Sequence, residues 1–100
     1  MTDEHDRIEA AKALAGWYFN LVTLSQRTAF NTAMMAARGY TGPRWDRARK
    51  AAHTNWDRDT AAARALYHVT LAEILETGEV SQALSYRWDE LTARAAEVAA

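Results

Sequence analysis

The sequence predicts an all-α protein, and three observations support this prediction. Ala supplies 22 of the 100 residues, and other strong helix formers such as Leu, Glu and Arg are frequent. One Pro and four Gly leave few positions for turns. Apolar residues recur at helical spacing along three segments. We expect a single domain over residues 1–100: a long antiparallel two-helix hairpin plus a shorter third helix, at about 3–38, 43–77 and 81–99, completed as a helical bundle by dimerisation.

The first expected helix begins with acidic residues, which suit a helix N-terminus, and ends before Gly39, which suits a C-terminal cap. It carries two apolar stripes, about 110° apart by the helical period. A helix that is apolar on most sides is usually buried on most sides, and we expect this for the first helix. The two stripes comprise Ile8, Ala11, Ala15, Tyr18, Val22, Ala29 and Ala36, and Leu14, Trp17, Leu21, Leu24 and Met35.

The second expected helix starts at Pro43, because proline is tolerated in a first helical turn, and Gly78 ends it. Ser81 is suited to cap the third helix. Each of these helices has one apolar stripe and one polar face, which is typical of amphipathic helices. The stripes are Trp45, Ala48, Ala52, Trp56, Ala63, Leu66, Tyr67, Thr70 and Ile74 in the second helix, and Val80, Leu84, Trp88, Leu91, Ala95 and Val98 in the third.

Composition and charge limit the classes of protein. A net charge of −1 with four Trp and four Tyr indicates a folded chain. The lack of Cys excludes disulfides, a thiolate nucleophile and a zinc–cysteine site. The charged N-terminus lacks the apolar segment of a signal peptide, and polar residues interrupt the apolar first helix. We therefore expect a cytoplasmic protein with no membrane partner and no cofactor.

Folding the hairpin at residues 39–42 leaves a two-helix arm from about Gln26 to Arg58, because the third helix is too short to reach the turn. Two helices alone cannot enclose large apolar side chains, and an exposed patch of such side chains marks an interaction surface. We therefore predict a protein-interaction module that forms a homodimer through this arm, or binds another protein there. The predicted interface residues are Phe30, Met34, Met35, Tyr40, Trp45 and Trp56.

Basic residues cluster beside the hairpin turn. Residues 38–64 carry seven basic and three acidic side chains, a local net charge of +4. We predict that these charges steer an acidic partner toward the arm. Contact with nucleic-acid phosphates is the alternative interpretation of the same patch. The residues predicted to provide the steering are Arg44, Arg47, Arg49 and Lys50.

One segment supports that alternative. Leu71-Ala72-Glu73-Ile74-Leu75, followed by Gly78-Glu79-Val80-Ser81-Gln82-Ala83-Leu84-Ser85-Tyr86-Arg87-Trp88, resembles the helix-turn-helix of bacterial repressors. The resemblance covers less than a quarter of the chain. It implies a dimeric DNA-binding regulator whose reading helix begins near Ser81 and enters the major groove. The residues that it implies as DNA-binding are Gln82, Ser85, Tyr86 and Arg87.

The sequence shows no pattern of catalytic or metal-binding residues. His5, His53 and His68 are too far apart along the chain for one helix to present two of them to a metal. Paired carboxylates, a nucleophile–base arrangement and a glycine-rich phosphate loop are not found. We predict no catalytic residue and no metal site, with a small dimeric helical enzyme as the alternative. Arg27 and Asp59 are expected to meet between the first two helices as a structural pair.

Overall fold

The chain folds entirely as helices in the part that the structure describes. The structure is a computed structural model, and it describes the backbone of residues 2–99 and the side chains of residues 3–97. Five helices follow one another without a strand over that range: α1 (Thr2–Val22), α2 (Leu24–Ala36), α3 (Gly42–Asp59), α4 (Ala61–Thr77) and α5 (Gln82–Ala99). The predicted all-α class is confirmed.

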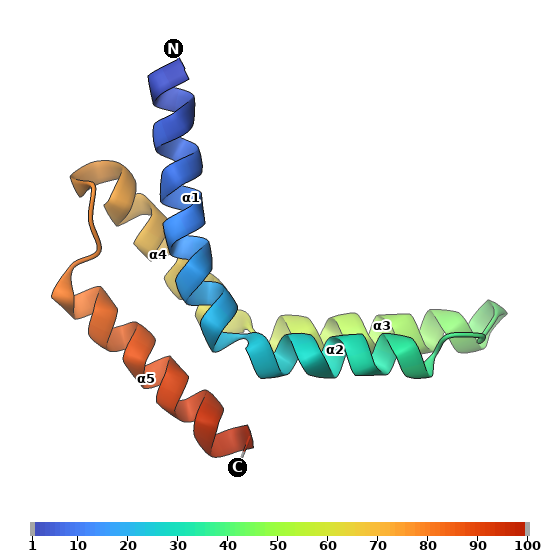
Figure 1. Ribbon diagram of the computed structural model, residues 1–100. Helices are drawn as coiled ribbons and strands as arrows, with labels where there is room; N and C mark the ends of the chain where they lie inside the picture. The colour runs from blue at the N-terminus through green and yellow to red at the C-terminus, as the bar shows by residue number, and fades with distance from the viewer. Residues whose placement is uncertain (1, 100) are drawn as a thin grey trace.

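The five helices form a bent, flat molecule of 48 × 38 × 15 Å (Figure 1). Helices α1 and α4 pack along each other, and α5 packs on both, which makes a three-helix body. Helices α2 and α3 pair with each other and project to one side as an arm. We refer to residues 24–59 as the arm, to residues 2–23 and 60–99 as the body, and to their junction at Thr23 and Thr60 as the elbow.

The structure has five helices where three were predicted, because each long helix is broken at one threonine. The backbone leaves the helical region at Thr23 (φ −99°, ψ 14°) and at Thr60 (φ −105°, ψ 6°). Each hydroxyl donates a hydrogen bond to the carbonyl four residues earlier. Such a bond competes with the helical ladder and bends helices. The hairpin therefore turns at the elbow instead of continuing straight.

The break at Thr23 also changes which side of the first long helix faces inward. Ala11, Ala15 and Val22 are buried in α1, as the first predicted stripe requires. Ala29 and Ala36, which continue that stripe, are exposed in α2. Phe30 and Met34 of α2 are half-buried instead. Ala37, directly after the helix, is buried.

The core lies in the body and is built around Trp88. The indole of Trp88 is only 1% exposed and stacks on Tyr18 with ring centroids 5.6 Å apart. Its Nε1 donates to the Thr70 hydroxyl at 2.9 Å, so the one polar atom of the ring is satisfied. The buried apolar residues around it are Val22, Ala63, Leu66 and Leu84, and a second buried group comprises Ala11, Ala15 and Ile74.

The helix ends follow the predicted turn signals except at Gly39, which was expected to cap the first helix: that helix ends at Ala36, and Ala37 is its C-cap. Pro43 lies in the first turn of α3, and Gly39 has φ +105° in the preceding turn. Gly78 caps α4 in the left-handed conformation, with φ 85°. The Ser81 hydroxyl accepts a hydrogen bond from the Leu84 amide at 3.3 Å, which makes it the cap of α5. None of the described helices is long and apolar enough to cross a membrane.

Candidate protein-interaction surface

Helix α1 is not buried on most sides, as was predicted, because one of its apolar faces is exposed to solvent. Ala11 and Ala15 are buried against α4, since alanine lets two helices approach closely. The larger residues lie on another side of the helix and continue past the elbow. We call these four residues the seam: Leu14, Trp17, Leu21 and Leu24, with exposed fractions of 39%, 56%, 55% and 59%.

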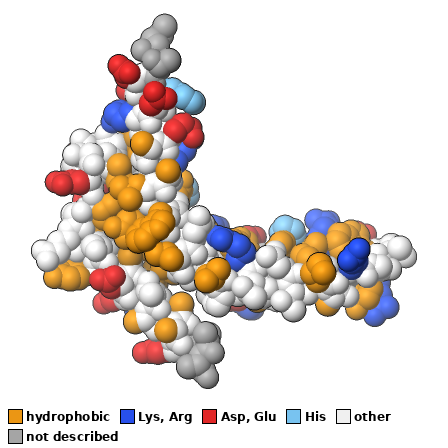
Figure 2. Space-filling model, viewed as in Figure 1, with side chains coloured by type: hydrophobic (Ala, Val, Ile, Leu, Met, Phe, Trp, Pro, Cys, Tyr) orange, Lys and Arg blue, Asp and Glu red, His pale blue; other side chains and the backbone are white. Residues whose placement is uncertain are grey.

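The seam is a patch rather than a set of scattered residues. Its members are three or four positions apart, so they lie on one face of α1 and the start of α2. Apolar side chains gather over the body in the space-filling view (Figure 2). The ring of Trp17 also meets Tyr18 edge-on at 5.0 Å, which fixes one side of the patch to the core. A contiguous exposed apolar patch of this kind is typical of a binding surface.

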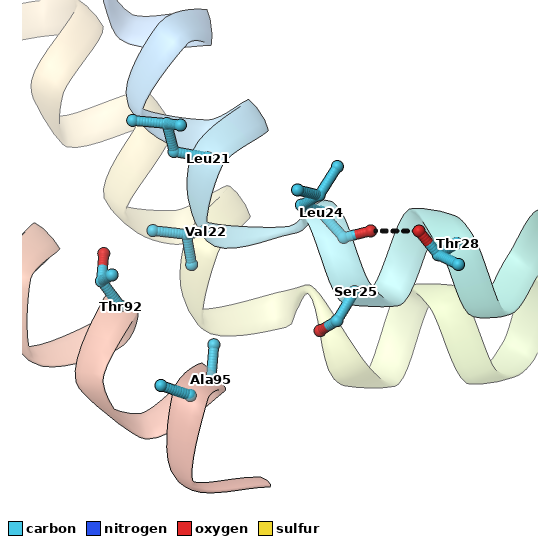
Figure 3. Close-up of a pocket in the computed structure, with 8 residues that line it drawn as sticks. Leu21, Val22, Leu24, Ser25, Thr28, Thr92 and Ala95 are labelled. Atoms are coloured by element: carbon cyan, nitrogen blue, oxygen red, sulfur yellow. Dashed lines mark hydrogen bonds between the residues drawn. The ribbon is translucent and has the colours of Figure 1, made fainter. Parts of the chain in front are cut away.

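A mostly apolar pocket of about 450 Å³ lies beside the seam at the elbow (Figure 3). One wall comes from the end of α1 and the start of α2, and the other comes from the last turns of α5. Ser25, Thr28 and Thr92 are the polar residues at its edge, and no charged side chain lines it. The pocket is therefore suited to an apolar side chain. Its apolar lining residues are Leu21, Val22, Leu24, Ala95 and Ala96.

Inside the arm, aromatic rings join α2 to α3. Phe30 meets Trp56 edge-on at 6.1 Å and His53 at 5.0 Å. Trp56 also meets Phe19 of α1 at 6.4 Å, so the ring cluster runs through the elbow into the body. A small pocket of about 280 Å³ opens between these rings, Arg27 and Asn31.

The structure places the predicted interface residues along this arm. Phe30 and Trp56 are half-buried against each other, and Met34, Tyr40 and Trp45 are also half-buried. Met35 is 64% exposed and is the most open large apolar side chain of the arm. These six residues therefore lie in one two-helix unit, and their role in binding stays a prediction.

Charge is divided unevenly between the two parts of the molecule. The arm carries seven basic and three acidic side chains, a net charge of +4, and the body carries five basic and ten acidic ones, a net charge of −5. Arg44 lies over the ring of Tyr40 at 3.8 Å, which holds one positive charge at the end of the arm. All four predicted steering residues, Arg44, Arg47, Arg49 and Lys50, are exposed on α3.

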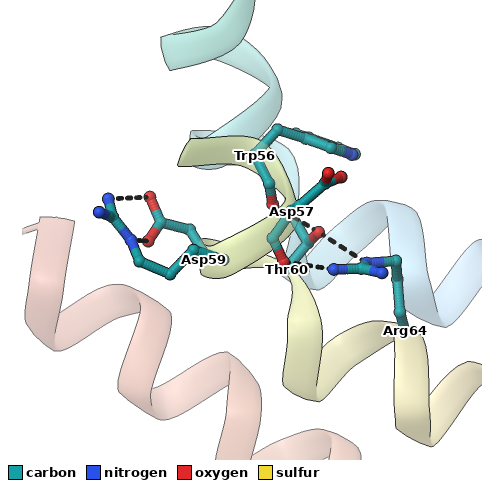
Figure 4. A network of polar contacts seen from close by, with 6 residues as sticks. Trp56, Asp57, Asp59, Thr60 and Arg64 are labelled. Atoms are coloured by element: carbon teal, nitrogen blue, oxygen red, sulfur yellow. Dashed lines mark hydrogen bonds and ion pairs between the residues drawn. The ribbon is translucent and has the colours of Figure 1, made fainter. Parts of the chain in front are cut away.

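Polar contacts at the elbow differ from the expected pair of Arg27 and Asp59 (Figure 4). Asp59 instead accepts two hydrogen bonds from the Arg58 guanidinium, and the shorter of them is 2.9 Å. These bonds and the negative charge of Asp59 raise the pKa of Arg58. Arg27 donates to the Asn20 side chain at 2.7 Å. The predicted pair is wrong, because Arg27 reaches back across the bend at Thr23 to Asn20 of α1 instead of across the arm to Asp59.

The segment that resembles a helix-turn-helix forms the end of α4, the turn and the start of α5. Gln82, Tyr86 and Arg87 are exposed, and Ser85 is half-buried. The Gln82 side chain donates to the Tyr86 hydroxyl at 2.9 Å. Asp89 and Glu90 follow directly on the same helix. This surface therefore has hydrogen-bonding groups for bases but little positive charge for phosphates.

The described residues show no group of three or more His, Asp or Glu side chains that could hold a metal ion. His53 and His68 are placed separately, against Phe30 and Tyr67 respectively. Sequence reasoning recognised the apolar stripe that contains the seam but did not assign it to the interface. The alternating spacing of three and four residues is the signal that could have done so.

Comparison of the chain with family models, with curated proteins and with solved structures gave no match. The interpretation of this surface therefore depends on its own geometry, charge and exposure.

Proposed function

We propose that the chain is a non-enzymatic helical module that binds a protein partner through the seam and the adjoining arm. One observation carries the proposal: α1 turns Ala11 and Ala15 to the core and leaves Trp17 and Leu21 more than half exposed. A helix that only had to stabilise its own fold gains most by burying its largest apolar side chains. The exposure of Trp17 and Leu21 supports a second partner for α1.

The exposed apolar side chains of the seam would supply part of the free energy that binding needs. Full burial of a large apolar side chain contributes about 1.5–3 kcal/mol, so four that are about half exposed contribute roughly 3–6 kcal/mol. A micromolar complex requires about 8 kcal/mol after the costs of association are met. A partner that brings a similar apolar surface, together with Met35 of the arm, would supply the remainder.

A photo-crosslinking amino acid at position 21 tests this proposal in cells that express the chain. We expect a covalent adduct with a protein from position 21. The matched control is position 54, which is exposed on α3 and outside both the seam and the predicted interface residues. Equal labelling from the two positions, or no adduct from position 21, would overturn the proposal.

DNA binding is the second candidate, and the basic arm together with exposed Tyr86 and Arg87 is the observation that favours it. Phosphate contacts weaken steeply with added salt, whereas a contact driven by apolar burial does not. Sedimentation with random-sequence duplex DNA at low and high salt distinguishes the two. Co-sedimentation that salt reverses, and that Arg87→Ala abolishes, would support the regulator.

A further inference from the structure

The seam has the spacing of a coiled-coil contact. Leu14, Trp17, Leu21 and Leu24 alternate steps of three and four residues, as positions a and d of a heptad do. The same pattern continues along α2 at Thr28, Asn31 and Met35, all exposed. The alternating spacing therefore runs from the first half of α1 to the end of α2, with the bend at Thr23 between the two helices.

No helix within the described part of this chain covers that face. Helix α4 packs on the side of α1 that carries Ala11 and Ala15, and α5 packs through Leu84 and Trp88 against the core. Helix α3 pairs with α2 through Phe30 and Trp56. Among the described residues, only the last turns of α5 come near the seam, at the pocket beside Leu21 and Leu24, so a partner that covers the rest of it would come from another molecule.

We propose that the occupant of the seam is a second copy of this chain, paired antiparallel about a two-fold axis through the elbow; this inference rests on the proposed function. Such an interface is isologous, because the same face of each copy meets the other. The axis places the arm of each copy on the body of its partner. The two helices that meet have charges of opposite sign: α2 has a net charge of +1 and α1 a net charge of −2, and the two-fold axis repeats this contact.

The bend selects one register for this pairing. Two bent helices can follow each other only if the bends coincide, so the axis must lie at Thr23. In an antiparallel coiled coil, position a of one helix faces position d of the other. With the axis between residues 22 and 23, Leu21 faces Leu24 of the second copy and Trp17 faces its Thr28. Met35 then faces Ala10, and the heptad pattern and the bend give the same register.

The pocket at the elbow fits this arrangement. It lies beside the proposed axis and is bordered by Leu21 and Leu24, which are the residues closest to it in the pairing. Each copy would therefore place a leucine at the mouth of the other's pocket, as a knob enters a hole. In this register Asp3 and Glu4 lie opposite residues 42 and 41 of the second copy, while Arg38 lies opposite Arg7.

Sedimentation across a range of concentrations tests the occupant, starting from a monomer mass of 11.2 kDa. We expect twice that mass for the wild type and the mass of a monomer for Leu21→Ser. The variant should keep its helical circular dichroism, because Leu21 is 55% exposed in the single chain. Val69→Ser is the matched control, because Val69 is 46% exposed on α4 and should leave the dimer intact.

Disulfide trapping tests the direction and register, since the chain has no cysteine of its own. Two variant chains, one with Ala10→Cys and one with Met35→Cys, are mixed and oxidised. The antiparallel register predicts about a tenfold excess of the mixed disulfide over either homodisulfide, because only positions 10 and 35 come within bridging distance. A parallel pairing would instead give the homodisulfides, and that result would overturn the proposed arrangement.

The failures are distinguishable. A chain that stays monomeric at every concentration, while position 21 still crosslinks to a different protein, would overturn the second copy as occupant and leave the proposed function standing. A monomer that gives no adduct from position 21 would overturn both.

Discussion

Thr23 and Thr60 bend the two helices of the hairpin side by side, each through a hydrogen bond from its hydroxyl to the carbonyl four residues earlier. The Thr23 hydroxyl donates to the Phe19 carbonyl at 2.7 Å, and the Thr60 hydroxyl donates to the Trp56 carbonyl at 2.7 Å. The rings of Phe19 and Trp56 are themselves in contact, which places both bends side by side. Because both threonines are buried, the bend belongs to the folded core and directs the arm away from the body.

The Thr60 hydroxyl should contribute measurably to stability. It also accepts a hydrogen bond from Arg64 Nε at 3.2 Å, and Arg64 donates further to the Asp57 carbonyl. Thr60→Val keeps the shape of the side chain but removes these bonds, so we expect a loss of about 1–3 kcal/mol in the free energy of unfolding. Denaturant unfolding measures it.

The control for this experiment is Thr28→Val. Thr28 makes the same type of bond, to the Leu24 carbonyl at 3.0 Å, but on the exposed side of α2. Water can replace an exposed hydrogen bond, so we expect a change within about 0.5 kcal/mol. If Thr60→Val and Thr28→Val lower the free energy of unfolding equally, burial at the elbow does not strengthen the contribution of the Thr60 hydrogen bond.

Substitution by alanine should lower the stability strongly at one tryptophan of the body and change it little at another. Trp88 is 1% exposed and bonded to Thr70, so Trp88→Ala should cost about 3–5 kcal/mol of unfolding free energy. Trp17 is 56% exposed, so Trp17→Ala should change the stability of the dilute monomer by less than about 1 kcal/mol. Denaturant unfolding at low protein concentration measures both. A large loss for Trp17→Ala would mean that its contacts lie within the chain.

The sequence was sufficient for the helix ends and for most of the inward faces. Pro43, Gly78 and Ser81 are residues whose backbone or side-chain properties end or begin helices locally, so their signals do not depend on the rest of the fold. Gly39 is the exception, because α2 ends at Ala36 and is capped by Ala37. The stripe of the second predicted helix also holds, because Leu66, Thr70 and Ile74 are all buried.

The elbow could not be read from the sequence. Threonine is common inside straight helices, and its bond to the carbonyl four residues back bends a helix only where packing favours the bend. Because the sequence does not predict the bend at Thr23, extending the stripe of α1 past it places Ala29 and Ala36 on the inward face of α2, where the structure has them exposed. The seam was found as a stripe, but periodicity shows that a face is apolar and does not show which neighbour covers it.

Two glycines should give opposite results when replaced by alanine. Gly78 has φ +85°, a conformation that alanine adopts only with strain, so Gly78→Ala should lower the unfolding free energy by about 1 kcal/mol. Gly16 lies inside α1, and an added Cβ there meets nothing within 4 Å, so Gly16→Ala should raise it by up to about 1 kcal/mol. Thermal unfolding compares the two variants, and a stabilised Gly78→Ala chain would contradict the left-handed cap.

Arg7 joins the start of α1 to the end of α4, and the pKa of Glu4 reports on it. Arg7 donates to the Leu75 carbonyl at 2.6 Å and to the Glu4 carboxylate at 2.8 Å. The second bond and the positive charge hold the pKa of Glu4 below its ordinary value. Since the folded chain favours the carboxylate, this contribution to stability is present above the unfolded pKa and is lost as the pH falls through the folded one.

Carboxyl-detected NMR titration measures the effect directly. In Arg7→Gln we expect the pKa of Glu4 to rise into the ordinary range, because both the hydrogen bond and the charge are removed. Lys12→Gln is the control: Lys12 pairs with Glu9 at 3.6 Å and should leave Glu4 unchanged. Amide exchange near Thr77 should also quicken in Arg7→Gln, because the Leu75 carbonyl in the last turn of α4 loses its donor. A Glu4 pKa that does not move would show that Arg7 is held by α4 alone.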